Sequence, residues 1–577
     1  MQQTQRRHRY FSRFYKTFLP LLLLFLLAFA IRLYSPRVGG VFLSSDEIYL
    51  FQYSLKPLSI IYTPSFDNFF VQLFRFFNFP WGWGTIFLST AGTAIVTLFG
   101  LSITEFTITL PYIIVGSATV VLVYLTGKEI KGKLYGFIAA LLIAFLPLHI
   151  IISRTIVGNI VSGIFFFFLS LFLFIKYFKT QKEFYRILGH IVVAYYFITE
   201  NQAIGIIVVL LCTSFLYCQE KHILSRVIES IRQLISCRGC FFAGIIVLPT
   251  LFSALYLFMK GLSQQSYLNL SHSKPLMLGF YLQETVKSIS KGTGTALFFL
   301  LIIGFFYYFL FYFLIPFLFR KEKEKSLLFL SYFFGYGIPW FFLIQPYINT
   351  STNGYHLHIT VSLIFIAAHF VEDIILFCKK IHTAYFKIFY GMALLITFSF
   401  VALYTSLVIV SEITLNQDIV PISLINSGFE GENIGIKTIG YYIRGNTPRK
   451  TVVLTDVELF VAQYYFGRNV SGELDLTPQE TKMLFEKTLA DENINYVFIK
   501  EDNLLLLNDL LKISGFVPRV YAVQKSEVKG ILFMKSELLA EQEVISERTP
   551  IILDIETYDP LFDQKYGTVQ ALFVDYE

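Results

Sequence analysis

The sequence predicts a polytopic α-helical membrane protein that ends in a soluble α/β domain. Hydrophobic residues make up 55% of the 577 residues and charged residues only 15%, whereas soluble domains carry about 25% charged residues. The apolar residues lie in runs long enough to cross a bilayer, and the part from 411 to 577 returns to an ordinary globular composition. A single large soluble enzyme is therefore excluded.

The membrane part, residues 18–410, contains the predicted spans. A helix needs about 20 mostly apolar residues to cross the hydrocarbon core of a bilayer. Residues 18–30 also fit a cleavable signal peptide, because a basic leader and an apolar run precede Ala28-Phe29-Ala30. We expect about eleven spans, the fifth and sixth of them short, near 18–34, 108–126, 134–152, 159–177, 187–199, 204–218, 241–259, 295–319, 327–347, 359–377 and 388–410.

Basic residues set the predicted orientation of these spans. They cluster in the N-terminal segment 1–17 and in the short loops that would face the cytoplasm, whereas the short loops on the other side hold Arg154 as their one basic residue. This positive-inside pattern places the N-terminus in the cytoplasm and residues 411–577 outside. The apolar segment 84–102 must then be re-entrant or interfacial within the first outer loop, 35–107. Because the net charge of +7 is divided among loops, nucleic acid is not an expected partner.

Residues 411–577 alternate between strand-like and helical segments. Thr451–Thr455 and Ile494–Ile499 are typical of strands, and 477–489 and 501–514 are typical of helices. The alternation predicts an α/β or α+β domain, which the predicted orientation places on the extracytoplasmic side.

Asp46 and Glu47, in the first outer loop, form the first candidate site. Adjacent carboxylates near a bilayer are costly to desolvate. One of them can act as a general base toward an acceptor hydroxyl, or hold an amine, while its neighbour orients a substrate. The alternative is structural, with Ser44 or Ser45 capping a juxtamembrane helix whose first turn holds the two acids.

The loop 153–159 supplies the second candidate site. Arg154 departs from the charge pattern of the other outer loops, and a guanidinium matches phosphate oxygens in a bidentate geometry. Its alternative role is to extend from the membrane interface into water. Arg154 and Asn159, at the two ends of this loop, are candidate substrate-binding residues.

The polar loop 349–358 supplies the third candidate site, in which Tyr355 and His356 are candidate substrate-binding residues. Its hydroxyls, amides and imidazoles suit a sugar or a phosphate. His356 and His358 also have a spacing that allows metal binding, but nothing else in the loop completes a ligand set. The sequence therefore indicates no cofactor, and a divalent metal stays open.

The order of these features resembles that of the GT-C superfamily of polytopic glycosyltransferases, especially the protein O-mannosyltransferases and the aminoarabinose transferase that modifies lipid A. The resemblance covers most of 18–218, and it rests on the order of the motifs because no single motif is specific. The features are a span ending in Arg32-Leu33, then Asp46-Glu47, Thr63–Phe66, Thr109–Gly116, Leu134–Ala140, Leu146-Pro147 and Ser153-Arg154, with weaker support from Tyr355–His358.

The resemblance implies a role for each matching residue. Asp46 would be the catalytic base, Glu47 its neighbour, and Arg154 a contact to the phosphate of a polyprenyl-phosphate-linked sugar. The sequence departs from the superfamily pattern at Asn159, where an acidic residue is common, and at Glu200-Asn201, where a lysine is common. These departures fit either a divergent enzyme or a protein that has lost the chemistry.

The predicted function is an inverting glycosyltransferase that moves a hexose or pentose from a polyprenyl-phosphate-linked donor to a lipid, glycan or protein acceptor. We expect it to act on the outer face of the membrane, with the plasma membrane and cell-envelope glycosylation as the setting. Only three Trp residues are present, so a tryptophan-rich oligosaccharyltransferase motif is absent. The alternatives are a transporter or flippase for a lipid-linked sugar and a non-catalytic envelope scaffold.

Overall fold

A computed structural model divides the chain into two compact units, one mainly from residues up to 427 and one mainly from residues 428 onward. The described residues are 2–33, 83–99, 105–153, 159–199, 203–218, 223–235, 238–248, 293–314, 328–339, 357–380, 439–440, 442–448, 450–457, 459–471, 478–489, 494–524, 527–538 and 551–554, with isolated positions at 283, 285–286, 289–290, 388, 391–392, 395, 399, 401 and 403.

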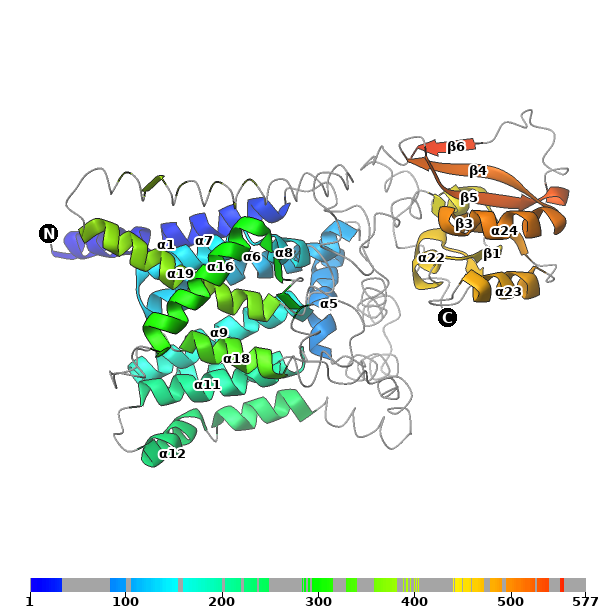
Figure 1. Ribbon diagram of the computed structural model, residues 1–577. Coiled ribbons are helices and arrows are strands. Elements are labelled where there is room, and N and C mark those ends of the chain that lie inside the picture. Colours follow the sequence, from blue (N-terminus) through cyan, green and yellow to red (C-terminus); the bar gives the residue numbers. More distant parts are fainter. Residues whose placement is uncertain are drawn as a thin grey trace. The chain divides into compact units, whose positions relative to one another are not determined.

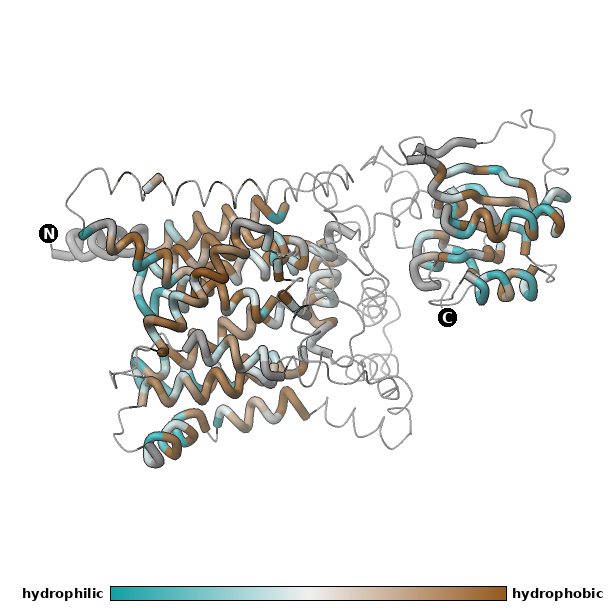
Figure 2. The backbone as a smooth tube through the Cα atoms, viewed as in Figure 1, coloured by the Kyte–Doolittle hydropathy of each residue, from teal (hydrophilic) through white to brown (hydrophobic). Residues whose placement is uncertain are grey.

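The first unit is a helical bundle whose helices are hydrophobic over most of their length (Figures 1 and 2). Helix α19 packs against α7, α16 and α18 and so lies at the centre of the bundle. The helices are α1 (Gln2–Leu33), α5 (Trp83–Leu98), α6 (Glu105–Ile130), α7 (Lys133–Ala144), α8 (Pro147–Ile152), α9 (Asn159–Thr180), α10 (Glu183–Phe197), α11 (Ile204–Tyr217), α12 (Ile223–Leu234), α16 (Thr295–Tyr308), the π-helix η4 (Phe309–Leu314), α18 (Leu328–Pro339) and α19 (Leu357–Lys380).

Several helices of this unit are long and apolar enough to cross a membrane. Within the described residues there are four, Thr109–Ile130, Val161–Thr180, Leu297–Leu314 and Leu357–Phe377. The pair Ser225–Leu234 and Arg238–Leu248, bent by 59°, gives a fifth candidate if the pair is one broken span. The chain is therefore a membrane protein, as its composition predicts.

The predicted span 134–152 is interrupted in the structure. Helix α7 ends at Ala144 and α8 begins at Pro147. A proline has no backbone N–H to donate and disfavours helical geometry in the residue before it. The amide of Leu146 accordingly bonds to the carbonyl of Ile143 at 3.2 Å, in a tightened last turn.

Glycines let the helices of the bundle approach closely, which is typical of helix packing in membranes. A Cβ atom at Gly136 of α7 would lie 2.4 Å from the carbonyl oxygen of Tyr124 in α6. One at Gly304 of α16 would lie 2.7 Å from the Cα atom of Ala367 in α19. Gly132 turns the chain between α6 and α7 with a φ of +140°, a conformation that L residues rarely adopt.

The second unit contains a six-stranded mixed sheet in the order β2-β1-β3-β5-β4-β6 (Figure 1). Strand β1 is parallel to β2 and β3, β5 is antiparallel to β3 and β4, and β6 is parallel to β4. The strands are β1 (Val452–Thr455), β2 (Asn469–Ser471), β3 (Ile494–Lys500), β4 (Phe516–Gln524), β5 (Glu527–Lys535) and β6 (Ile551–Asp554), and the helices are α22 (Leu459–Phe466), α23 (Pro478–Thr488) and α24 (Glu501–Ile513).

The core of the second unit forms where the sheet meets its helices. Leu454 of β1 and Val497 of β3 are fully buried there with Phe485 of α23 and Leu507 and Leu511 of α24. The predicted strands at the start of this unit correspond to β1 and β3, and the predicted helices to α23 and α24. The predicted boundary at 410 and 411 lies outside the described residues.

Candidate functional site

The sequence-predicted site residues lie mostly outside the described residues. Asn159 is the first residue of α9, and the structure describes its backbone only. The remaining five are Asp46, Glu47, Arg154, Tyr355 and His356. Three described residues lie near the ends of the undescribed segments that contain them, namely Arg32, Ser153 and His358. They belong to two polar clusters, which show how the bases of the predicted site loops are held.

Arg32, at the C-terminal end of α1, is the centre of the first cluster and is fully buried. Its Nη1 donates to the carbonyl oxygen of Ala28 at 2.9 Å, its Nη2 lies 2.5 Å from Nδ1 of His149, and its Nε donates to the hydroxyl of Ser153 at 3.3 Å. A buried arginine in a membrane protein is costly and requires such partners. We call Arg32, His149 and Ser153 the Arg32 cluster.

The contact to Arg32 fixes the protonation of the His149 ring. Guanidinium groups only donate, so Nδ1 of His149 accepts and the imidazole is neutral, with its proton on Nε2. That Nε2 atom is buried and has no hydrogen-bond partner among the residues that the structure describes. The cluster is therefore a buried guanidinium that donates to the Ala28 carbonyl, the Ser153 hydroxyl and a neutral imidazole.

Gly116 of α6 makes room for the Arg32 cluster. A Cβ atom at this position would lie 2.3 Å from Oγ of Ser153 and 3.3 Å from Nε of Arg32. The hydroxyl of Ser153 in turn donates to the carbonyl oxygen of His149. Helices α1, α6 and α8 thus meet at the Ser153 hydroxyl. Any side chain at position 116 would displace this hydroxyl.

The Arg32 cluster brings two chain ends together. Leu33, the last described residue of α1, follows Arg32, and Ser153 is the last described residue after α8. In the sequence, the first of these ends leads into the predicted loop of Asp46 and the second leads directly to Arg154. The bases of the two predicted site loops therefore lie next to each other.

His358, near the start of α19, is the centre of the second cluster. Its Nε2 lies 3.0 Å from the hydroxyl of Tyr196 and its Nδ1 3.4 Å from that of Tyr332. Its ring stacks on Tyr336 with the centroids 4.3 Å apart and 8° between the planes. All four residues are buried. Both ring nitrogens of His358 face tyrosine hydroxyls, so this histidine is a packing residue at the base of the loop of Tyr355 and His356.

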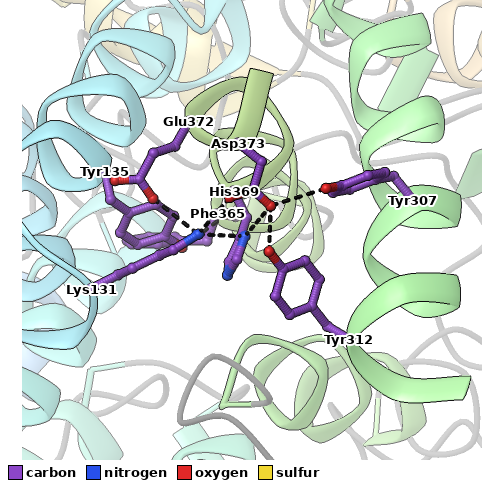
Figure 3. Close-up of polar contacts among 8 residues, drawn as sticks. All are labelled: Lys131, Tyr135, Tyr307, Tyr312, Phe365, His369, Glu372 and Asp373. Atoms are coloured by element: carbon purple, nitrogen blue, oxygen red, sulfur yellow. Dashed lines mark hydrogen bonds and ion pairs between the residues drawn. The ribbon is translucent and has the colours of Figure 1, made fainter. Parts of the chain in front are cut away.

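A third polar cluster surrounds Lys131, in the turn between α6 and α7 (Figure 3). Its Nζ lies 3.0 Å from Oε2 of Glu372 and 3.1 Å from Oδ1 of Asp373, and it contacts Nδ1 of His369 at 2.8 Å. His369 is fully buried, and the two carboxylates are mostly buried. We call these residues, with Tyr307 and Tyr312, the Lys131 cluster.

Two tyrosines complete the Lys131 cluster from the opposite side (Figure 3). Tyr307 of α16 donates to Oδ2 of Asp373 at 3.1 Å, and Tyr312 of η4 donates to the same oxygen. Tyr135 of α7 donates to the carbonyl oxygen of Phe365 in α19 at 2.9 Å. Together, the Lys131 cluster and the bond from Tyr135 tie α16, η4, α7 and the turn before α7 to α19. The basic loop to which Lys131 belongs is predicted to face the cytoplasm, on the side opposite Asp46.

The sequence contains signals for the buried charges of the Arg32 cluster and the Lys131 cluster. Arg32 stands at the end of a span that the charge pattern assigns to the outer side, where basic residues are rare. Glu372 and Asp373 lie within the predicted span 359–377, and a charge inside a span needs a partner. His149 carries no such signal, because a single histidine at the end of an apolar run is ordinary.

Among the described residues there is no group of three or more His, Cys, Asp or Glu side chains placed to hold a metal ion.

Comparison with known proteins finds its matches among solved structures. No protein-family model matches the sequence, and no curated protein matches it. The structure of ArnT from Cupriavidus metallidurans bound to undecaprenyl phosphate is similar, with a TM-score of 0.50, 11% sequence identity and coverage of 89% of this chain and 97% of that one. The apo oligosaccharyltransferase of Archaeoglobus fulgidus matches with a TM-score of 0.49, 13% identity and coverage of 89% and 74%.

The likeness to ArnT bears on the fold. It extends over nearly the whole of both chains, so it includes the helical bundle in which the Arg32 cluster lies. ArnT is a glycosyltransferase of the GT-C superfamily. The chain therefore has the GT-C fold, as the resemblance of its N-terminal part implies.

Proposed function

We propose that this chain is a membrane glycosyltransferase that transfers a sugar from a polyprenyl-phosphate-linked donor to a lipid, glycan or protein acceptor. The GT-C fold agrees with the proposal. A fold by itself hosts many functions, so the support for this function must come from the residues of the site. The similar structure of ArnT holds undecaprenyl phosphate, a polyprenyl phosphate of the class that carries the sugar in the donor proposed here.

The observation that carries the proposal is the bonding of Arg32 to His149 and Ser153. Arg32 precedes the predicted loop of the two acidic candidates in the sequence, and Ser153 directly precedes Arg154, so their contact supports a site to which both loops contribute. A transferase of this kind needs a carboxylate base and a phosphate-binding cation on opposite sides of one anomeric carbon. Two loops that start at neighbouring points can supply both.

In the proposed reaction, the acceptor oxygen attacks the anomeric carbon of the donor sugar. The bond between that carbon and the phosphate oxygen breaks, and the polyprenyl phosphate leaves with the electron pair. Asp46 accepts the proton of the acceptor hydroxyl, and Glu47 orients the acceptor. Attack from the face opposite the phosphate inverts the anomeric configuration.

Arg154 holds the phosphate in this proposal, because a guanidinium can donate two parallel hydrogen bonds to phosphate oxygens. In this proposal the sugar is contacted by Asn159, at the start of α9, and by Tyr355 and His356, which precede His358 in the sequence. A base and a positioned cation suffice for a leaving group as good as phosphate, so we propose that the reaction has no metal requirement. The site lies on the outer face, opposite the basic loops.

Proteoliposomes that contain the full-length chain test the proposal. The donor is polyprenyl phosphate carrying a radiolabelled hexose or pentose, and the acceptors are a membrane extract of the source cells. Label that appears in a new glycosidic bond, with release of polyprenyl phosphate, supports the transferase. Label that crosses the bilayer while it stays on the lipid indicates a transporter. If the label neither crosses the bilayer nor enters a new bond, the chain is a scaffold. Activity that survives a chelator agrees with a metal-free reaction.

A further inference from the structure

Helix α12 is held against the bundle by contacts with α10 and α11. Ser214 of α11 donates its hydroxyl to the carbonyl oxygen of Ser230 at 3.0 Å. Arg226 donates to the carbonyl oxygen of Phe215 at 2.7 Å and stacks over the Phe215 ring at 4.4 Å. Arg186 of α10 donates to the carbonyl oxygen of Ile235 at 3.2 Å, just past the end of α12. The orientation of α12 about its own axis is therefore fixed.

The face of α12 next to this packed face is apolar and exposed. Val227, Ile228, Ile231 and Ile235 have between 41% and 59% of their surface exposed. At about 100° per residue these four positions lie within roughly a quarter to a third of the helix circumference. Four exposed large aliphatic residues on one stripe are costly in water, so this stripe contacts something apolar.

The third face of α12 is charged. Arg232 has an 83% exposed side chain, and its Nη1 lies 3.8 Å from Glu229. Arg232 lies beside the edge of the apolar stripe, and Glu229 lies farther round toward the packed face. Hydrophilic and hydrophobic residues alternate along this helix in Figure 2. The order around the helix is thus packed face, apolar stripe, then arginine.

The apolar surface continues into the helix Arg238–Leu248, which is bent by 59° from the helix before it. Phe241, Phe242, Ile245 and Leu248 are exposed, and Arg238 is exposed at the start. The start of this helix packs closely on α10, because a Cβ atom at Gly239 would lie 2.7 Å from Nδ1 of His190. A second arginine therefore stands at the bend, at the end of the first apolar stripe.

We propose that α12 is an interfacial helix that binds anionic phospholipids in the leaflet next to the basic loops. Val227, Ile228, Ile231 and Ile235 lie in the acyl-chain boundary, and Arg232 and Arg238 contact the phosphates. A helix with an apolar stripe and arginines at its edge lies in the membrane plane in this way. Net positive charge beside the stripe favours anionic over zwitterionic headgroups. The helix Arg238–Leu248 then leads from the interface into the bilayer.

Tryptophan fluorescence tests the depth of α12. The full-length variant Ile231→Trp is placed in nanodiscs, and its added fluorescence over the unsubstituted chain is measured with brominated phospholipid and with aqueous acrylamide. The control is Leu505→Trp in the second unit, because Leu505 is 97% exposed. We expect brominated lipid to remove most of the added fluorescence of Ile231→Trp and none of that of Leu505→Trp. Quenching of Ile231→Trp by acrylamide alone, or by neither agent, overturns the proposal, since the stripe then faces water or protein.

Native mass spectrometry of the full-length chain tests the headgroup preference. The chain is released from nanodiscs of equal phosphatidylglycerol and phosphatidylcholine, and the retained lipids are compared. An arginine near an anionic surface contributes about fivefold to binding, so Arg232→Gln with Arg238→Gln lowers the phosphatidylglycerol enrichment severalfold. The matched control is Lys482→Gln with Lys487→Gln, which removes the same charge from exposed positions on α23. An unchanged enrichment in the arginine variant, or an equal loss in the control, overturns the assignment.

Discussion

Nη2 of Arg32 lies 2.5 Å from Nδ1 of His149, so the end of α1 is bonded to α8 across 117 residues of sequence. Both residues are fully buried. The contact joins the two helices from which the predicted catalytic loop and the predicted phosphate-binding loop depart. The proposed function depends on this junction, because a transferase loses rate steeply when its base and its substrate shift by about 1 Å.

Replacement of Arg32 by Ala is expected to lower the rate of sugar transfer by about 100-fold, because the junction of α1 and α8 loosens. The rate constant at saturating donor, measured in proteoliposomes, checks this. Leu23→Ala on the same helix is the control, since Leu23 is 56% exposed, and it should keep the unsubstituted rate. Arg32→Lys keeps the charge but loses the fork of donors. If Arg32→Lys is as active as the unsubstituted chain, charge alone matters and the junction does not.

Replacement of Lys131 by Met is expected to destabilise the bundle by about 3 kcal/mol, because it leaves Glu372 and Asp373 without their cation. Thermal unfolding in detergent measures the loss. Lys133→Met, two residues away and exposed, should change the unfolding temperature little. Equal effects of the two substitutions would show that the Lys131 cluster contributes no more than a surface charge.

Replacement of Gly136 by Ala is expected to lower the stability of the bundle by about 1–3 kcal/mol, the usual cost of overpacking. The added methyl group would meet the backbone of α6 at 2.4 Å and 2.7 Å, and backbone atoms cannot move aside as a side chain can. Gly244→Ala is the control, because nothing lies within 4 Å of the added atom and Ala favours a helix. The temperature of thermal unfolding should therefore fall for Gly136→Ala and stay the same or rise for Gly244→Ala.

The Asp456 carboxylate sets a pH dependence for the second unit. It accepts from the amide of Lys500 at 3.0 Å and from Asn503 at 2.9 Å. Burial raises the pKa of Asp456 above its ordinary value, and these hydrogen bonds oppose the rise. A carboxyl whose pKa is raised in the folded state contributes stability that is complete below the unfolded pKa of about 3.9 and is lost as the pH rises through the folded pKa.

Replacement of Asp456 by Asn removes this titration. The stability of the unsubstituted chain relative to Asp456→Asn is expected to fall as the pH rises from below 4 toward neutrality. Hydrogen exchange of β1 and β3 in the full-length chain, corrected for the intrinsic rate at each pH, measures the difference. A difference that stays constant, or that grows with pH, would mean that the pKa of Asp456 is not raised.

The predicted topology rests on patterns that are local in the sequence, and the buried clusters are not local. Apolar runs and the charges between them are sufficient to predict helices such as α9 and α19. The break between α7 and α8 is indicated in the sequence only by Pro147, which lies inside an otherwise continuous apolar run. By contrast, Lys131 meets Asp373 across 242 residues, and only the packing of α7 on α19 brings them together. The sequence therefore indicates that a charged residue in a span needs a partner without showing which residue that partner is.

The candidate site divides in the same way. The residue types of Asp46 and Arg154 point to a base and a phosphate contact, because chemistry is read from side chains. The proximity that we propose for their loops rests on the contact between Arg32 and His149, which lie far apart in the sequence. The sequence shows Arg32 only as an arginine at the end of a predicted span, and such an arginine usually reaches water. Its full burial is a property of the folded bundle alone.

The most direct test of the proposed function is the rate of transfer from a polyprenyl-phosphate-linked sugar by the variant Asp46→Asn in proteoliposomes. Asn keeps the size of Asp but cannot accept the acceptor proton, and general bases contribute about 10²–10⁴-fold to a rate. We expect a loss in that range, with donor binding by native mass spectrometry unchanged. Transfer by Asp46→Asn at the rate of the unsubstituted chain would contradict the proposed mechanism.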